Sequence, residues 1–137
     1  MMYIDTNIFV YAIENHPKYG VSCKKILEDV ENKKIDVACS TLVLTELINV
    51  LVKIKKVAGD KLNVKESISA VLSLPINWTD MSIFIIENAA SYKYNVSGAD
   101  YIHIATMEMN SISKIISADG DFDKVDNVKR IDPLNYK

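Results

Sequence analysis

Short apolar runs that alternate with longer helical stretches limit the possible folds of this chain more than any other feature. The runs show no regular alternation of polar and apolar residues, and a strand without that alternation is buried on both faces, as in a parallel sheet. Helical stretches between successive runs supply the crossovers that parallel strands require. The pattern predicts an α/β fold in which helices cover both faces of a central parallel sheet. The predicted strands are residues 1–4, 35–39, 113–118 and 128–131, with a strand or connector at 76–78.

Five helices are predicted from the helical spacing of apolar residues. The second is apolar around most of its circumference, so we expect it to be buried. Pro75 ends the third, and Thr79 or Asp80 begins the fourth. Residues 5–7 form a turn or a further helix start, because Asp, Thr and Asn all cap helices. The helices are residues 21–32, 41–57, 63–74, 80–92 and 98–110. The predicted inward face of the fourth helix consists of Met81, Phe84, Ile85, Ala89 and Tyr92.

The bulk properties indicate an ordinary globular protein. A length of 137 residues predicts a single domain over residues 1–137, and 49% hydrophobic and 25% charged residues suit one hydrophobic core. The net charge of -2 gives no general reason to expect a nucleic-acid partner, although a basic patch is compatible with it. Cys23 and Cys39 fit neither a zinc site nor a disulfide framework and are predicted to pack in the core of an intracellular protein. With no signal peptide and no membrane-spanning run, the expected location is the cytoplasm.

Four carboxylates stand where predicted strands or helices begin or end. Asp5 and Asp119 each follow a strand, so they belong at the carboxyl edge of the sheet, where α/β proteins bind their ligands. Asp100 lies in the first turn of a helix, and helix N-termini tend to face the same edge. Glu46 lies one turn further along its helix. We therefore expect the four carboxylates to meet.

Each of these acids also has an ordinary structural explanation. Asp5 is a possible helix N-cap, and Ser97 and Asp100 have the spacing of a capping box. Residues 119–123 have an acid at every second position, which is common in solvated turns and also at the start of an EF-hand calcium loop. The twelfth position of that loop would need Glu, and the chain has Arg130 there. Glu46 is harder to explain, because its stretch is apolar and an ion-pair partner such as Lys53 is seven positions away.

Taken together, the acids favour a site for hard divalent cations. Crowded carboxylates raise one another's pKa values, and Mg²⁺ or Mn²⁺ relieves this repulsion through all-oxygen ligation. Two such ions about 3.5–4 Å apart can stabilise the attacking and leaving oxygens of a phosphodiester displacement. His103 follows Asp100 by three positions and shares its helical face. It is either a metal ligand or a packing and supporting residue, and the preference of hard cations for oxygen favours the second.

Four segments, in this order and spacing, resemble the motifs of PIN domains over nearly the full chain. They are residues 3–7 (Tyr-Ile-Asp-Thr-Asn), 41–46 (Thr-Leu-Val-Leu-Thr-Glu), 97–105 (Ser-Gly-Ala-Asp-Tyr-Ile-His-Ile-Ala) and 116–122 (Ile-Ser-Ala-Asp-Gly-Asp-Phe). The resemblance implies a PIN-like α/β/α sandwich with a central parallel sheet. It also implies an endoribonuclease that hydrolyses RNA phosphodiester bonds with Mg²⁺ or Mn²⁺.

The resemblance also assigns roles to individual residues. Asp5, Glu46 and Asp100 match the first three catalytic and metal-binding acids of the family. The fourth falls within residues 119–121, where we favour Asp119 over Asp121. Small polar residues at matching positions are expected to hydrogen-bond the carboxylates or a metal-bound water. These residues are Thr6, Asn7 and Ser117.

A short chain of this kind most resembles the VapC-type toxin of a VapBC toxin–antitoxin pair. That likeness implies an RNA substrate, an antitoxin partner and a homodimer. An RNA-processing factor and a non-catalytic RNA- or protein-binding module are the alternatives. A receiver-like domain is disfavoured, because it would need an Asp at the end of a mid-chain strand, and Asp36 stands at the start of its strand. The candidate RNA-contacting residues, which also fit a solvated helix surface, are Lys24, Lys25, Lys33, Lys34, Lys53, Lys55 and Lys56.

Overall fold

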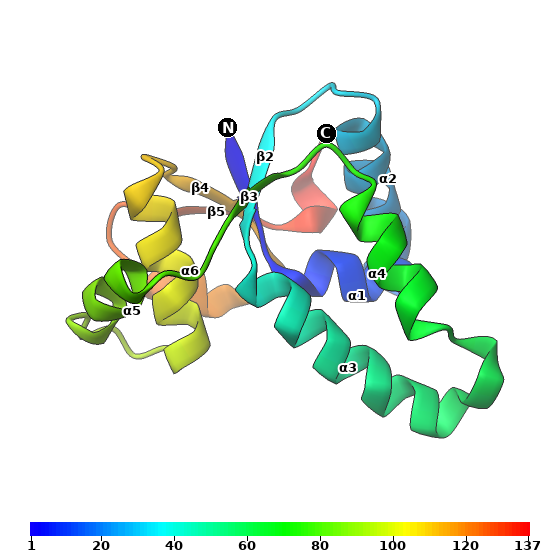
Figure 1. Ribbon diagram of the computed structural model, residues 1–137. Helices are drawn as coiled ribbons and strands as arrows, with labels where there is room; N and C mark the ends of the chain where they lie inside the picture. The colour runs from blue at the N-terminus through cyan, green and yellow to red at the C-terminus, as the bar shows by residue number, and fades with distance from the viewer.

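A computed structural model describes residues 1–137, and five short strands and six α-helices form three layers in it (Figure 1). The strands are β1 (Met2–Ile4), β2 (Val37–Ser40), β3 (Asn77–Thr79), β4 (Lys114–Ile116) and β5 (Lys129–Ile131). The helices are α1 (Thr6–Ile13), α2 (Gly20–Glu31), α3 (Leu42–Ala58), α4 (Val64–Leu72), α5 (Ile83–Ala90) and α6 (Gly98–Met109). Three short 3₁₀ segments are η1 (Gly59–Lys61), η2 (Gly120–Lys124) and η3 (Pro133–Asn135).

The sheet is parallel throughout, which confirms the prediction from the apolar runs. The strand order is β3-β2-β1-β4-β5. Tyr3 of β1 pairs with Ala38 on one side and with Ile115 on the other. The chain thus extends the sheet from β1 in both directions, and the order reverses next to β1. In open α/β sheets such a switch point leaves a crevice at the carboxyl ends of the strands.

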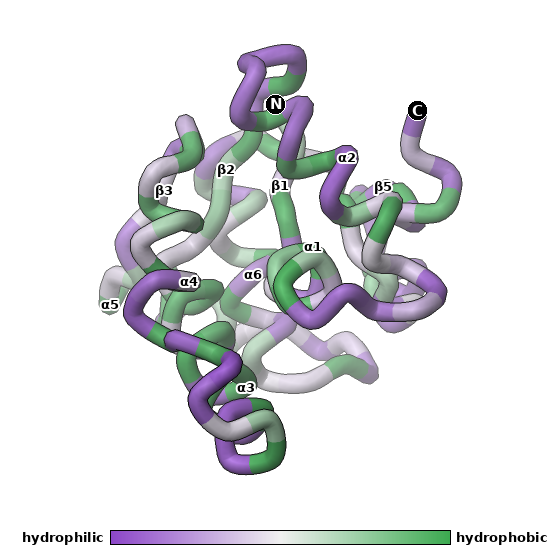
Figure 2. The backbone as a smooth tube through the Cα atoms, turned by 90° about the vertical axis from the view of Figure 1, so that its right-hand side faces the viewer, coloured by the Kyte–Doolittle hydropathy of each residue, from purple (hydrophilic) through white to green (hydrophobic).

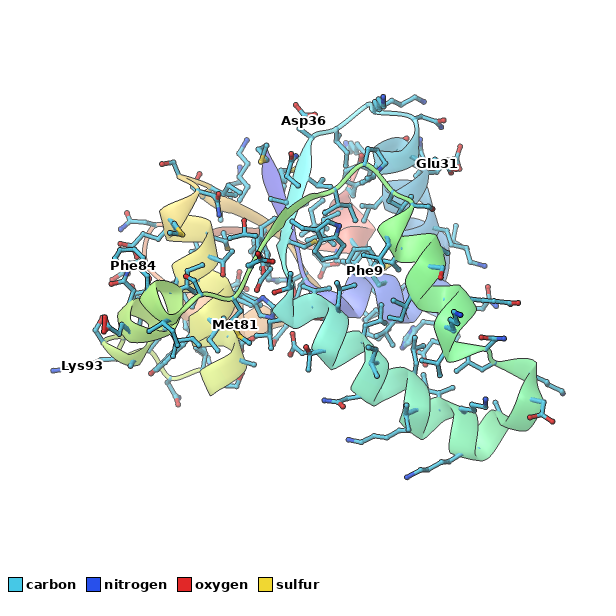
Figure 3. The ribbon with its side chains drawn as sticks, viewed as in Figure 1. Phe9, Glu31, Asp36, Met81, Phe84 and Lys93 are labelled. Atoms are coloured by element: carbon cyan, nitrogen blue, oxygen red, sulfur yellow. The ribbon has the colours of Figure 1, made fainter.

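The two faces of the sheet are buried against different helices. Because side chains alternate across a strand, Ile4 packs toward α1, α2 and α3, whereas Tyr3 packs toward α6 and η2. The larger cluster includes Phe9, which lies in the helical layer where α1 approaches α4 (Figure 3). Helix α5 packs on the outside of α6 through Ile85 and Ala89. In Figure 2 the tube is hydrophobic along β1 and turns hydrophilic at the carboxyl end of that strand.

Helix α3 is less buried than its sequence predicts, so that expectation is wrong. Only Val43, Leu47 and Leu51 are fully buried, along one stripe. Ile48 is 41% exposed and Val57 is 92% exposed. The cause is the length of the helix, because its second half extends beyond the sheet and meets little besides α4 (Figure 1). The apolar circumference of α3 therefore lies partly on the surface.

Helix α5 begins at Ile83, later than predicted. Thr79 cannot start it, because Thr79 belongs to β3 and pairs with Ser40. Ser82 is the N-cap instead, and its hydroxyl accepts a hydrogen bond from the Ile85 amide at 3.2 Å. Of the predicted inward face, Ile85 is buried, whereas Phe84 is 58% exposed and lies at the outer surface (Figure 3).

Cys23 and Cys39 are buried free thiols in the larger cluster, as predicted. None of the helices combines the length and the apolar character that a membrane span requires.

The C-terminal segment is fastened to α2 through one buried carboxylate. Lys25 donates a hydrogen bond to Asp29 Oδ1 at 2.5 Å, and the Tyr136 hydroxyl donates to Oδ2 at 2.8 Å. These two hydrogen bonds hold the pKa of Asp29 below its ordinary value of 3.8. The ionised carboxylate is therefore favoured in the folded state.

Replacing Asp29 should make stability less dependent on acid pH. An acid with a lowered folded pKa stabilises the protein above its unfolded pKa, and this contribution is lost as the pH falls through the folded pKa. We expect Asp29→Asn to lower the free energy of unfolding in urea at pH 6, and the deficit to shrink at pH 3. Asp36→Asn, at an exposed position whose side chain takes no part in this contact, is the control. An Asp29→Asn deficit of equal size at both pH values would contradict this account.

Candidate functional site

An open cleft of about 450 Å³ lies at the carboxyl ends of β1 and β4, beside the switch in strand order. It brings together the four acids predicted from the sequence and the alternative fourth acid. These residues are Asp5, Glu46, Asp100, Asp119 and Asp121. Thr6, Asn7, Tyr11 and Ser97 also line the cleft. The parallel sheet therefore gathers carboxylates from four separate parts of the chain.

The helix-capping roles that the sequence predicts for these acids are also present in the structure. Asp5 is the N-cap of α1, and Asp119 is the N-cap of η2. Ser97 caps α6 by accepting a hydrogen bond from the Asp100 amide at 3.2 Å. Capping and facing the cleft are compatible here, because an N-cap at the end of a parallel strand already lies at the ligand-binding edge.

Asp5 is the most buried of the five acids and is hydrogen-bonded on both oxygens. The Thr6 amide donates to Oδ1 at 2.8 Å. Oδ2 accepts from the Ser117 hydroxyl at 2.6 Å and from the Asn7 amide group at 3.2 Å. Burial raises the pKa of Asp5, although the charge of His103 and the hydrogen bonds from Ser117 and Thr6 act in the opposite direction. Asp5 is thus fixed in orientation but poorly solvated.

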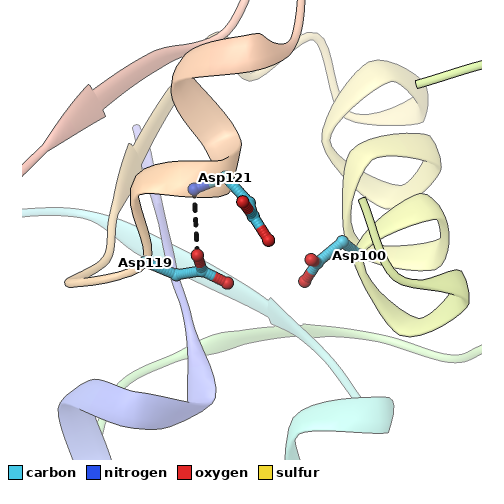
Figure 4. Close-up of side chains that lie close together, drawn as sticks. All are labelled: Asp100, Asp119 and Asp121. Carbon is cyan, nitrogen blue, oxygen red and sulfur yellow. Dashed lines mark hydrogen bonds between the residues drawn. The ribbon is translucent and has the colours of Figure 1, made fainter. Parts of the chain in front are cut away.

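Three aspartates from two elements form a tight cluster. The carboxylate oxygens of Asp100, Asp119 and Asp121 approach within 4.8 Å of one another, with Asp100 reaching across from α6 (Figure 4). The Asp121 amide donates to Asp119 Oδ1 at 2.9 Å and so fixes that side chain. Burial, followed by the charges of Asp5 and Asp119, raises the pKa of Asp100. The arrangement concentrates the negative charge of three carboxylates, of which only Asp121 has a cationic partner, Lys124.

Glu46 reaches the cleft from α3 and is hydrogen-bonded by two residues. Its Oε1 accepts from the Thr6 hydroxyl at 2.8 Å and lies 2.6 Å from His103 Nε2. Burial opposes the charge of Glu46, but the bonds from His103 and Thr6 outweigh it and lower the pKa of this carboxyl. The basic partner of Glu46 is therefore His103, 57 positions away in the sequence, and not Lys53. His103 lies outside the aspartate cluster.

The loop that carries Asp119 and Asp121 is held by cationic side chains. Arg130 donates to the Ser117 carbonyl at 3.0 Å and pairs with Asp123 at 3.0 Å. Lys124 donates to Asp121 Oδ1 at 2.8 Å. Lys124 was not predicted at the site, although its i,i+3 spacing from Asp121 in the sequence indicates such a pair.

None of the seven candidate lysines lines this cleft. Lys25 and Lys34 instead lie beside Asp29, at 2.5 and 3.9 Å. Lys24 lines a separate cavity between α1, α2 and α4. An RNA-contacting role for the lysines stays a prediction.

The donor set of the cleft suits a hard divalent cation. Its ligands are carboxylate oxygens, with no thiolate, and both buried cysteines lie elsewhere. Mg²⁺ and Mn²⁺ prefer such oxygen ligands, whereas zinc prefers nitrogen and sulfur. The residues placed to hold an ion are Asp5, Asp100 and Asp119, with Glu46 and Asp121 at the same cleft.

The sequence matches the PIN domain family over residues 2–128. No curated protein matches it. The fold is similar to that of a chain in the crystal structure of VapBC2 from Rickettsia felis, which is bound to a DNA fragment from the VapBC2 promoter. The identity is 22% and the TM-score is 0.72, and the alignment covers 96% of this chain and 98% of that chain. It is also similar to VapC20 from Mycobacterium tuberculosis, a Sarcin-Ricin loop cleaving toxin, with 19% identity, a TM-score of 0.70 and coverage of 90% and 93%. A toxin–antitoxin complex from Klebsiella pneumoniae gives 20% identity, a TM-score of 0.65 and coverage of 97% and 98%.

Neutralising one acid of the cluster should stabilise the metal-free protein. The folded pKa of Asp100 is raised, so its ionised form costs stability as the pH rises above the ordinary value of 3.8. We expect Asp100→Asn to raise the free energy of unfolding in EDTA at pH 7 and to have no such effect at pH 3. Asp80→Asn, at an exposed loop position, should change little at either pH. A loss of stability at pH 7 in Asp100→Asn would contradict the crowding of charge described above.

Proposed function

The chain belongs to the PIN domain family, and we propose that it is an endoribonuclease that hydrolyses RNA phosphodiester bonds with Mg²⁺ or Mn²⁺. The observation that carries the proposal is the convergence of five carboxylates in one cleft at the switch point of the sheet. Helix capping accounts for Asp5 and Asp119 at this edge of the sheet, but it does not account for Glu46, which lies inside α3 and caps no helix. An enzyme of this kind fits residues 1–137 as a single domain.

In this proposal the carboxylates are the catalytic residues. Asp5, Glu46, Asp100 and Asp119 would hold the metal, and a bound Mg²⁺ or Mn²⁺ would activate a water and neutralise charge on the phosphate. The protein contributes fixed ligand positions. Ser117 and Asn7 orient Asp5, and Thr6 orients Glu46. The Thr6 hydroxyl orients Glu46 and the Ser97 hydroxyl caps α6, so both have structural roles, and the proposed metal chemistry needs no side-chain nucleophile. Attack by water is therefore the mechanism that suits the site.

Asp119 is the better candidate for the fourth acid. Its Oδ1 is fixed by the Asp121 amide, and its backbone amide donates to Ser117 Oγ at 3.0 Å, beside Asp5. Asp121 is instead paired with the Lys124 ammonium group. Removing Asp119 should therefore weaken metal binding more than removing Asp121, which plays a supporting part.

The biological role that we propose is the toxin of a toxin–antitoxin pair, acting in the cytoplasm. Support comes from the similar fold of VapC20, of VapBC2 and of the Klebsiella complex. The partners are then an RNA substrate, an antitoxin protein and a second copy of the chain. Exposed apolar side chains on α3 and α5 suit a homodimer, because such side chains mark protein interfaces. They are Ile48, Val52, Ile83 and Phe84.

A non-catalytic RNA- or protein-binding module is the alternative. The absence of Lys and Arg among the residues that line the cleft favours only the protein-binding form of this alternative, because RNA phosphates need positive charge. The complete set of acids opposes it, since a site without catalysis has no use for crowded carboxylates. A PIN-fold factor in RNA processing would use the same chemistry on a different RNA.

Cleavage of a mixed structured RNA pool tests the proposal. We expect cutting by the wild-type protein in Mn²⁺ or Mg²⁺, none in EDTA, and a loss of more than about 100-fold in Asp5→Asn and Asp119→Asn, which remove proposed ligands. Asp121→Asn should lose less activity, and the exposed control Asp80→Asn should lose none. Cutting that survives EDTA, or that Asp5→Asn retains, would contradict a metal-dependent nuclease. RNA binding without turnover would support the binding module.

A further inference from the structure

A buried chain of hydrogen bonds leads from the sheet to Glu46. The Ser40 amide donates to the Tyr3 hydroxyl at 3.0 Å, and that hydroxyl lies 2.5 Å from His103 Nδ1. The opposite ring nitrogen of His103, Nε2, lies 2.6 Å from Glu46 Oε1. Tyr3 is 0% and His103 1% exposed, so water does not compete with these bonds. The chain links β2, β1, α6 and α3 in sequence.

The partners determine which atoms donate. Tyr3 accepts from Ser40, so its own hydrogen is free to go to His103 Nδ1. With Nδ1 as acceptor, the ring hydrogen of a neutral imidazole is on Nε2 and points at Glu46. An ionised carboxylate has no hydrogen to give, so Nε2 donates to Glu46 in the imidazolium as well. The contact with Glu46 therefore does not depend on the charge state of His103.

This contact fixes one oxygen of Glu46 and leaves the other available. His103 and Thr6 both bind Oε1, and no protein group donates to Oε2. A glutamate has a long flexible side chain, and Glu46 is 31% exposed at the cleft, so without these bonds it would sample several rotamers. The bonds restrict Glu46 within the cleft that the other acids also line, and its second oxygen stays free to bind a ligand there. His103 is also one turn from Asp100 on α6, so it couples the two helices that supply these ligands.

We propose that His103, fixed by Tyr3, is a positioning residue that presents Glu46 Oε2 to the metal. This rests on the proposed function above. Both ring nitrogens of His103 are engaged by protein groups, so the histidine acts through Glu46 and does not ligate the ion itself. In metal sites, partners that orient a ligand in this way contribute about 10- to 100-fold to affinity or activity.

A matched pair of amides at position 103 tests the proposal. The Gln amide nitrogen reaches about where His Nε2 lies, so His103→Gln keeps the bond to Glu46. Asn is one methylene shorter, so His103→Asn keeps only the contact on the Tyr3 side. Mn²⁺ affinity of the metal-free protein, measured by calorimetry, is the readout and needs no RNA. We expect His103→Asn to bind Mn²⁺ about 10- to 100-fold more weakly and His103→Gln to stay within about 3-fold of wild type.

A double-mutant cycle with Glu46→Gln separates positioning from a general effect on the fold. If His103 acts through Glu46, His103→Asn should weaken Mn²⁺ binding further by less than about 2-fold in the Glu46→Gln background. Full additivity, or equal losses in His103→Asn and His103→Gln, would overturn the inference. Thermal unfolding of each variant confirms that folded protein is compared. Failure of the wild-type protein to bind Mn²⁺ would instead overturn the proposed function, and the inference with it.

Discussion

The buried carboxylate of Asp5 is the group on which the geometry of the cleft depends. It stands at the carboxyl end of β1, where the strand order reverses, and it would be costly to desolvate without partners. The Thr6 amide, Ser117 and Asn7 supply these partners, and Asn7 also accepts from the Ala118 amide at 3.3 Å. The same bonds tie the end of β1 to the end of β4. Asp119 comes directly after Ser117 and Ala118, so one hydrogen-bond network positions both Asp5 and Asp119.

The remaining acids are brought to this point by the fold, against their own repulsion. Helix α6 carries Asp100 toward Asp119, and α3 carries Glu46 toward Thr6. Burial and neighbouring charge raise the pKa values of Asp5 and Asp100, so in the metal-free protein these two acids oppose folding at neutral pH. The large apolar clusters on both faces of the sheet compensate for this penalty. Because the carboxylates repel one another, a bound cation would increase the stability of the folded state.

The sequence predicts the parallel sheet and the meeting of the acids, because both follow from local patterns. Continuous apolar runs indicate a buried parallel sheet, and an acid that ends such a run must lie at its carboxyl edge, as Asp5 and Asp119 do. The contact between Tyr3 and His103 was not predictable, because it joins residues 100 positions apart whose side chains suit an ordinary core. The exposure of α3 and the late start of α5 also depend on tertiary context, namely where the sheet ends and which residue pairs with Ser40.

The location of bound Mn²⁺ is the most direct test of this account. Crystals of the protein soaked in Mn²⁺ and measured at the manganese absorption edge would reveal each ion by its anomalous scattering. The account predicts a peak in the cleft bounded by Asp5, Asp100 and Asp119, and its loss in crystals of Asp5→Asn. A cleft without a peak, or a peak that persists unchanged in Asp5→Asn, would contradict the claim that these carboxylates form a metal site.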